Sequence, residues 1–94
     1  MNDSDIIPLL HALDRPTLFS LDIDFYRRDL RHQAYCLVYL DVNVDIVAEF
    51  IRRVLRHREL NTKAKRMGNV IHVQPQSMTL WRMHHETELQ IEWK

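Results

Sequence analysis

The segment just before the C-terminus constrains the fold most, because its side chains alternate in character. Apolar or β-branched residues take turns with polar ones in the order Glu86, Thr87, Glu88, Leu89, Gln90, Ile91, Glu92, Trp93. A period of two residues is typical of a strand that buries one face. A turn at His84–His85 would fold this strand back on the preceding residues as a hairpin. The resulting register pairs Leu80 with Leu89 and Met78 with Ile91, and it leaves Thr79, Trp81 and Met83 on the other face.

Other segments carry the periodicity of regular structure. The stretch 34–42 is apolar at both its odd and its even positions, as in a central strand covered on both faces. Between residues 44 and 58, apolar residues recur every three or four positions behind the candidate N-cap Asn43, which predicts the longest helix. Shorter elements are expected as a helix at 8–14, a strand at 17–25, and a strand at 70–73 after a turn at Gly68-Asn69.

These elements predict an α+β fold. Its mostly antiparallel sheet has four to five strands, with one long helix packed on a face and a short N-terminal helix. The chain has 94 residues, 46% of them apolar, which is enough for one hydrophobic core and too few for two. Residues 1–94 are therefore expected to form a single domain.

Glycine occurs only once, at Gly68. Loops that cradle phosphates and turns that present nucleophilic serines need several glycines, so the familiar nucleotide-dependent and serine-hydrolase chemistries are disfavoured. The six histidines show no zinc-ligand spacing, so neither a metal nor a cofactor is expected. Cys36 lies in an apolar run and predicts a buried thiol, the alternative being a nucleophile paired with a distant histidine.

The chain shows no sign of a membrane or export address. Its acidic start, MNDSD, lacks the basic segment of a signal peptide. No apolar run approaches the roughly eighteen residues that a membrane span requires. A cytoplasmic location without membrane contact is expected.

Charge is unevenly distributed along the chain, although the formal net charge is zero. Residues 1–24 carry five acids and one base, and residues 51–67 carry seven bases and one acid. Such a basic segment predicts contacts to nucleic-acid phosphates, whereas the zero net charge favours a simple solvated helix face. The candidate phosphate-binding residues are Arg52, Arg53, Arg56, Lys63, Lys65 and Arg66.

Two other sites are suggested by the pattern. The hairpin register predicts a protein-binding surface made of Trp81, Met83, Glu88 and Trp93. Alternatively, the N-terminal helix covers Trp81 and Met83, which are then ordinary core residues. Asp41, Asp45 and Glu49 suggest a metal-assisted hydrolase, although Asp45 can instead complement a helix N-terminus and Glu49 can pair with Arg53.

The scarcity of catalytic motifs favours a small non-catalytic protein-binding regulator or inhibitor-like module over an enzyme. Its partner is another protein, or a second copy bound through the C-terminal hairpin. Nucleic-acid binding through the basic segment is the first alternative, and metal-assisted hydrolysis is the second.

Overall fold

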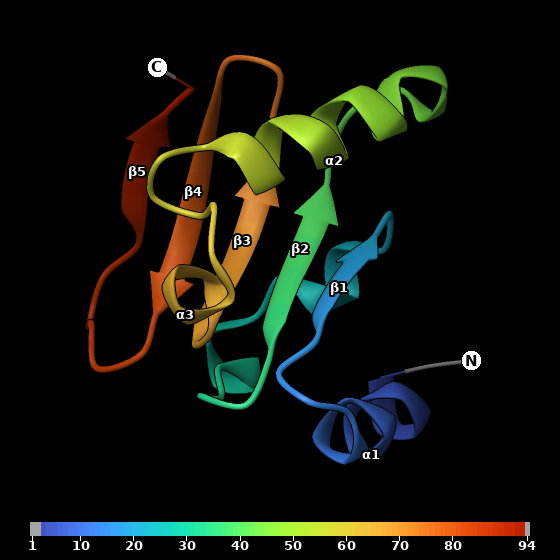
Figure 1. Cartoon of the computed structure of the whole chain (residues 1–94), viewed down its shortest axis with the longest axis vertical. Helices are drawn as coiled ribbons and strands as arrows, with labels where there is room; N and C mark the ends of the chain where they lie inside the picture. Colours follow the sequence, from blue (N-terminus) through green and yellow to red (C-terminus); the bar gives the residue numbers. More distant parts are fainter. Residues whose placement is uncertain (1–2, 94) are drawn as a thin grey trace.

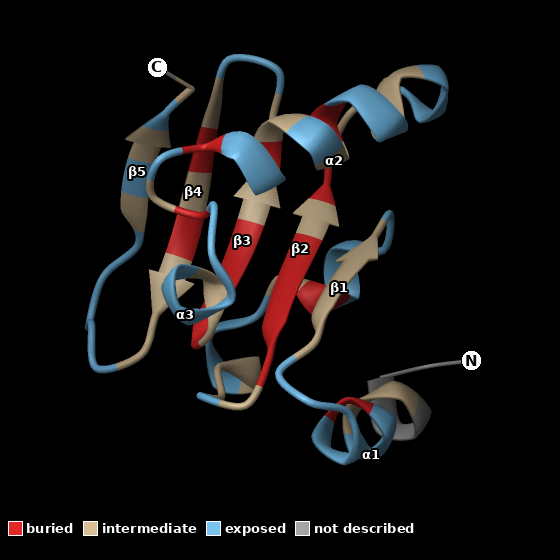
Figure 2. Cartoon of the chain, viewed as in Figure 1, coloured by how far each residue is buried: buried red, intermediate tan, exposed pale blue. Residues whose placement is uncertain are grey.

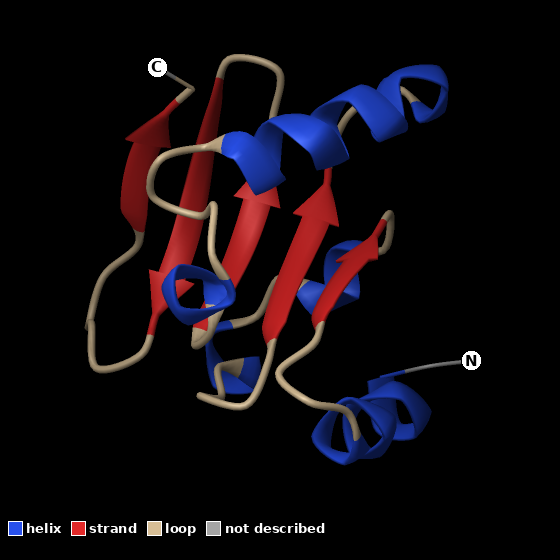
Figure 3. Ribbon diagram, in the orientation of Figure 1, coloured by secondary structure: helices blue, strands red, loops and turns tan. Residues whose placement is uncertain are grey.

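The computed structural model describes residues 3–93, which form a five-stranded sheet with helices on both sides (Figures 1 and 3). The strands are β1 (Thr17–Ser20), β2 (Cys36–Leu40), β3 (Asn69–Val73), β4 (Ser77–Arg82) and β5 (Leu89–Glu92). The α-helices are α1 (Asp3–Ala12), α2 (Val47–Arg56) and α3 (Lys63–Arg66). Three 3₁₀ helices, η1 to η3, cover Ile23–Phe25, Arg28–Leu30 and Val44–Ile46. None of these helices is long and apolar enough to cross a membrane.

The sheet is mixed, with the strands in chain order from β1 to β5. β1, β2 and β3 are parallel, while β3–β4 and β4–β5 are antiparallel. The expectation of a mostly antiparallel sheet is therefore met only in part. β1, β2 and β3 can pair in parallel because the chain between them is long. After each strand it returns to the end of the sheet where that strand began, as parallel pairing requires. The C-terminal hairpin has the predicted register, with Leu80 opposite Leu89 and Met78 opposite Ile91.

The two parallel connections lie on opposite faces of the sheet. The α2 connection packs on the face that bears Cys36 and Val38, here called the front face. The η1 and η2 connection packs with α1 on the face that bears Leu37, the back face. Since both connections advance across the sheet in the same direction, they have opposite hands. Figure 1 shows α2 in front while the upward strands advance from right to left, so β2–α2–β3 is the left-handed crossover, a rare arrangement.

The front face is apolar except at one end of the sheet, where Thr17, Asn69 and Arg82 lie in the same row as Cys36. Phe50 and Val54 of α2, together with Leu60 from the loop that follows, pack onto β2, β3 and β4. Figure 2 shows buried residues along the central strands and exposed residues along the outward side of α2. The sheet side chains of this core are Cys36, Val38, Leu40, Ile71, Val73, Met78 and Leu80.

The back face is divided into an apolar row and a polar row. The apolar row runs across the strands as Leu18, Leu37, Val70 and Trp81. It is covered by Leu10 of α1, Phe25 of η1 and Tyr35. The next row on the same face is polar, and it runs as Ser20, Tyr39, His72, Thr79 and Gln90. Tyr26, directly after η1, reaches this polar row and contacts His72 and Thr79.

Several predicted elements have different bounds in the structure. The strand expected at 17–25 ends at Ser20, because the hydroxyl of Ser20 accepts a hydrogen bond from the backbone of Asp22 (3.0 Å). The side chain of Asp22 in turn accepts one from the backbone of Asp24 (2.9 Å) and caps η1. The alternation of polar residues in this segment thus marks a cap rather than a strand.

The helices also depart from their predicted bounds. The long helix expected at 44–58 is divided into η3 and the ten-residue α2. Asn43 precedes η3 without a side-chain capping hydrogen bond. The N-terminal helix starts earlier than expected, with Pro8 inside it. Packing of Ile6, Ile7 and Leu10 against the back-face core favours this longer helix despite the missing proline N–H.

Leu60 and Leu55 offer a test of this packing, since they are the same residue type in very different surroundings. The side chain of Leu60 is fully buried, whereas Leu55 is 38% exposed. We expect Leu60→Ala to lower the free energy of unfolding by about 2–5 kcal/mol. Leu55→Ala should cost about 1 kcal/mol or less. Urea unfolding followed by circular dichroism measures both, and equal losses would contradict this placement of the core.

Candidate anion-binding surface

A shallow depression lies beside α3, between the loop after α2 and the end of β4. Its volume is about 340 Å³, and it is lined by Arg58, Glu59, Lys65 and Arg82. Three of these side chains are cationic and one is anionic. We call this depression the basic pocket. Only Lys65 belongs to the set of phosphate-binding residues that the sequence predicts.

Arg82 is held in place by a buried amide. The Nε of Arg82 donates to Oδ1 of Asn69 (3.1 Å), whose residue is only 1% exposed. The Nδ2 of Asn69 donates to the backbone oxygens of Lys65 (2.9 Å) and Arg66 (3.1 Å). Asn69 therefore ties the guanidinium of Arg82 to α3. The Nη atoms of Arg82 make no hydrogen bond to any residue that the structure describes.

The turn before β3 brings these groups together. Gly68 has a backbone φ of +86°, a conformation that residues with a Cβ rarely adopt. A Cβ at this position would lie 2.8 Å from Cγ of Met83. The backbone oxygen of Gly68 accepts from the N–H of Met83 (3.1 Å), so the end of β4 lies against the turn. The single glycine thus positions the neighbouring pair Asn69 and Arg82 at the pocket.

Hydrogen bonds also order the other pocket wall. The Nζ of Lys65 donates to the backbone oxygen of Arg58 (2.7 Å). Thr62 caps α3 by accepting from the backbone N–H of Lys65 (3.2 Å). Nδ1 of the buried His57 accepts from the backbone N–H of Glu59 (3.1 Å), and Nε2 donates to the backbone oxygen of Glu92 (2.6 Å). The loop that carries Arg58 and Glu59 is therefore fastened at both ends.

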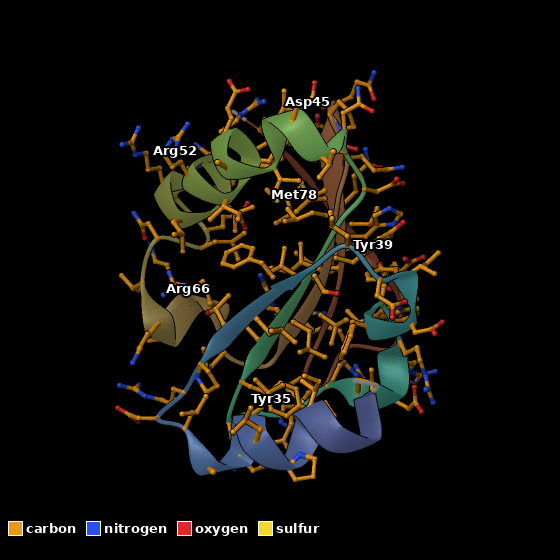
Figure 4. All side chains as sticks on the ribbon, turned by 90° about the vertical axis from the view of Figure 1, so that its right-hand side faces the viewer. Tyr35, Tyr39, Asp45, Arg52, Arg66 and Met78 are labelled. Atoms are coloured by element: carbon orange, nitrogen blue, oxygen red, sulfur yellow. The ribbon has the colours of Figure 1, made fainter. Side chains whose placement is uncertain are left out.

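The six predicted phosphate-binding residues have different surroundings in the structure. Arg52 and Arg56 are exposed on α2 and make no hydrogen bond or ion pair with the described residues. Arg53 instead stacks over the ring of Trp93, with its Cζ 4.5 Å from the ring centroid. Figure 4 shows Arg52 and Arg66 on the same side of the sheet.

The three remaining cations all donate hydrogen bonds within the structure, Lys65 to the backbone oxygen of Arg58 in the pocket wall. Arg66 donates to Thr17 Oγ1 and to the backbone oxygen of Leu60, at 3.0 Å each. Lys63 donates to the backbone oxygen of Asp14 (3.1 Å). These contacts join α3 to β1, to the loop after α2 and to the segment after α1. Arg66 and Lys63 therefore stabilise the fold, while Lys65 lines the pocket.

The ion pairs of the structure do not neutralise the cations of α2 and the basic pocket. Within residues 6–93, ion pairs join Arg15 and Lys63 to Asp14, Arg27 to Asp29, and Arg28 to Glu86, and His72 is hydrogen-bonded to Asp41. None of them includes a cation from α2 or from the basic pocket. We define the basic surface as the five cations Arg52, Arg56, Arg58, Lys65 and Arg82.

The back face carries a second polar cluster. Nε2 of His72 lies 3.0 Å from Oδ2 of Asp41. The ring centroids of Tyr26 and Tyr39 lie 5.1 and 4.8 Å from that of His72. The hydroxyl of Tyr26 is hydrogen-bonded to Glu88, and burial, reinforced by this carboxylate, raises the pKa of Tyr26. With carboxylates on both sides, this cluster is a poor site for an anion.

The three carboxylates considered for a metal do not assemble into a site. Asp41 pairs with His72, while Asp45 in η3 and Glu49 in α2 are exposed. Among the described residues, no three histidine, cysteine, aspartate or glutamate side chains gather closely enough to hold a metal ion. The suggested pair of Glu49 with Arg53 does not form either, because Arg53 stacks on aromatic rings.

The four predicted interface residues are spread over both faces of the sheet. Trp81 packs on the back-face core, with the Cζ of Arg28 5.6 Å from its ring centroid. Trp93 lies on the front face, where its Nε1 donates to the backbone oxygen of Gln74 (3.0 Å). Met83 follows β4 and Glu88 precedes β5. These residues do not form one continuous patch.

Comparison of the chain with models of protein families, with curated proteins and with solved structures finds no match. The chemistry of the basic surface is therefore derived from its own geometry. Arg82 and Asn69 were not singled out in the sequence, because they lie outside the charged segment. The one signal for them was the Gly68-Asn69 turn, which precedes the strand that β4 pairs with.

Cys36 provides a test that separates a structural thiol from a nucleophile. The side chain is fully buried, and burial raises the pKa of the Cys36 thiol to about 12. Since the thiolate is the reactive species, we expect very slow reaction with Ellman's reagent in the native protein near neutral pH, and rapid reaction in denaturant. Rapid stoichiometric labelling of the native protein would contradict this placement.

Proposed function

We propose that this protein binds the phosphates of nucleic acid through its basic surface. The observation that carries the proposal is that five cations from α2, α3, β4 and one loop lack carboxylate partners among the described residues. Phosphate oxygens are natural partners for such groups, because arginine donates to them in a forked geometry. A cytoplasmic location, without membrane contact, is part of the proposal.

The charges on the two sides of the sheet favour binding of nucleic acid on the front side. The back face presents Asp41 and Glu88 beside the polar row, where a polyanion would be repelled. On the front side, Arg52 and Arg56 lie one helical turn apart on the outward side of α2. Arg58 continues the basic surface from α2 into the pocket. A net charge of zero is therefore compatible with a strongly positive surface on one side.

The salt dependence of binding tests the proposal. We expect a fluorescently labelled duplex to bind at low salt, with an affinity that falls steeply as salt rises. If Arg52 and Arg56 each neutralise one phosphate, each glutamine substitution should reduce the slope of log K against log salt by about 0.9 on duplex DNA. Fluorescence anisotropy at several salt concentrations provides the measurement.

Arg27→Gln is the matched control, because it removes the same charge from the N-terminal end of η2 on the opposite side. It should leave the salt slope unchanged. The proposal fails if the unmodified protein binds neither DNA nor RNA at about 50 mM salt, where phosphate contacts are strong. It also fails if Arg27→Gln reduces binding as much as Arg52→Gln.

A second candidate function is docking of a protein partner on β5. β5 pairs with β4 alone among the described strands, so it forms an edge of the sheet. The backbone groups on its outer side can pair with another strand. A second copy of the chain, joined about a two-fold axis, would extend the sheet and give the homodimer expected from the hairpin. A regulator that docks on another protein could use the same edge.

Lysine at the β5 edge tests this second candidate. In a two-fold dimer, Gln90→Lys places like charges from both copies near the shared edge, so we expect it to shift a dimer towards monomer. Asn43→Lys, between β2 and η3 and away from β5, adds the same charge at an exposed amide and should leave assembly unchanged. Sedimentation velocity at several protein concentrations measures both. A wild-type protein that stays monomeric would remove the dimer from consideration.

A further inference from the structure

The basic pocket differs from the rest of the basic surface in how its cations are held. Arg52 and Arg56 project from one side of a helix, where each can meet a separate phosphate. In the pocket, by contrast, Arg58, Lys65 and Arg82 line a single depression. Three cations that share one site favour a ligand whose negative charge is concentrated at one point.

The charge of the ligand distinguishes an internal phosphate from a terminal one. A phosphodiester within a nucleic-acid strand carries a single negative charge, whereas a phosphate monoester carries about −1.5 to −2 near neutral pH. A monoester also offers three terminal oxygens as strong hydrogen-bond acceptors. The three cations of the pocket therefore match a terminal phosphate better than an internal one.

The depression has room for more than a bare ion. Its volume of about 340 Å³ lies within the range of small-ligand sites. Glu59 is the one anionic side chain on its wall. Its carboxylate would repel a second phosphate, but it can accept hydrogen bonds from sugar hydroxyls or base amino groups. A single nucleotide with its terminal phosphate satisfies both the cations and Glu59.

Arg82 is prepared for such a ligand before it binds. Its Nε is already bonded to Asn69, and its Nη atoms make no hydrogen bond with the described residues. Because the guanidinium is oriented in advance, little side-chain entropy remains to be lost on binding. Two parallel hydrogen bonds from an arginine to phosphate oxygens also provide geometric selectivity.

We infer that the basic pocket receives the phosphorylated end of a nucleic-acid strand, with Arg82 as the residue that distinguishes a terminal phosphate from an unphosphorylated end. This inference rests on the proposed function, since Arg52 and Arg56 would hold the rest of the strand. Arg58 and Lys65 supply further positive charge at the phosphate. Glu59 faces the attached nucleoside.

Three labelled oligonucleotides of one sequence test the inference, with a 5′-phosphate, a 3′-phosphate or hydroxyls at both ends. The label is internal, so that both ends remain available. We expect one phosphorylated oligonucleotide to bind about tenfold or more tightly than the hydroxyl form, which corresponds to one strong charge-assisted contact. Anisotropy titrations at a fixed salt concentration measure the ratio. Comparison of the 5′-phosphorylated and 3′-phosphorylated oligonucleotides also shows which end the pocket accepts.

Variants separate the pocket from the general surface. Arg82→Gln and Arg58→Gln should weaken the preferred phosphorylated oligonucleotide about tenfold more than the hydroxyl oligonucleotide, so that the preference is lost. Arg52→Gln should weaken all three oligonucleotides by a similar factor and leave the preference intact. A thermal melt of each variant identifies loss of folding, and Arg58→Gln retains the test if Arg82→Gln unfolds, because Arg58 is exposed.

The possible outcomes are distinguishable. If no oligonucleotide binds, the proposed function fails and takes this inference with it. Equal affinity for all three oligonucleotides refutes only the terminal-phosphate inference. A preference for phosphorylated ends that survives in both pocket variants would place the recognition elsewhere and also refute it.

Discussion

The position of β3 controls the rest of the structure. This strand lies between a parallel neighbour, β2, and an antiparallel one, β4. Four of its five residues are buried, so both faces of the sheet must be covered around it. Because β2 and β3 are parallel, the chain must cross the sheet through α2 before β3 begins. Because β3 and β4 are antiparallel, β4 ends beside the start of β3. As a result, the turn at Gly68, the end of β4 and α3 meet at one place, where the basic pocket forms.

The two faces of the sheet have different consequences for function. On the front face, α2 uses its inward side to cover an apolar core, and its outward side is free to carry positive charge. On the back face, the covering segments pack mainly on the apolar row, and Tyr26 extends this cover to His72 in the polar row. Acidic groups gather near that row.

The candidate site was only partly predictable, because arginines with similar sequence surroundings have different roles. The dense run of cations between 51 and 67 includes Arg52 and Arg56, which are exposed on α2. It does not distinguish them from Arg66, whose guanidinium joins α3 to β1. It also gives no reason to include Arg82, which reaches the pocket only because β4 pairs with β3. Charge is visible locally, whereas the partner of each charge depends on packing.

The sequence by itself determined the C-terminal hairpin with its register and the amphipathic character of α2. Both follow from the periodicity of apolar and polar side chains within one short segment, which does not depend on the rest of the fold. Tertiary structure decided the mixed sheet, the left-handed crossover and the basic pocket. These features join residues far apart in the chain. Their geometry depends on which face each connection covers, and burial of the whole core settles that choice.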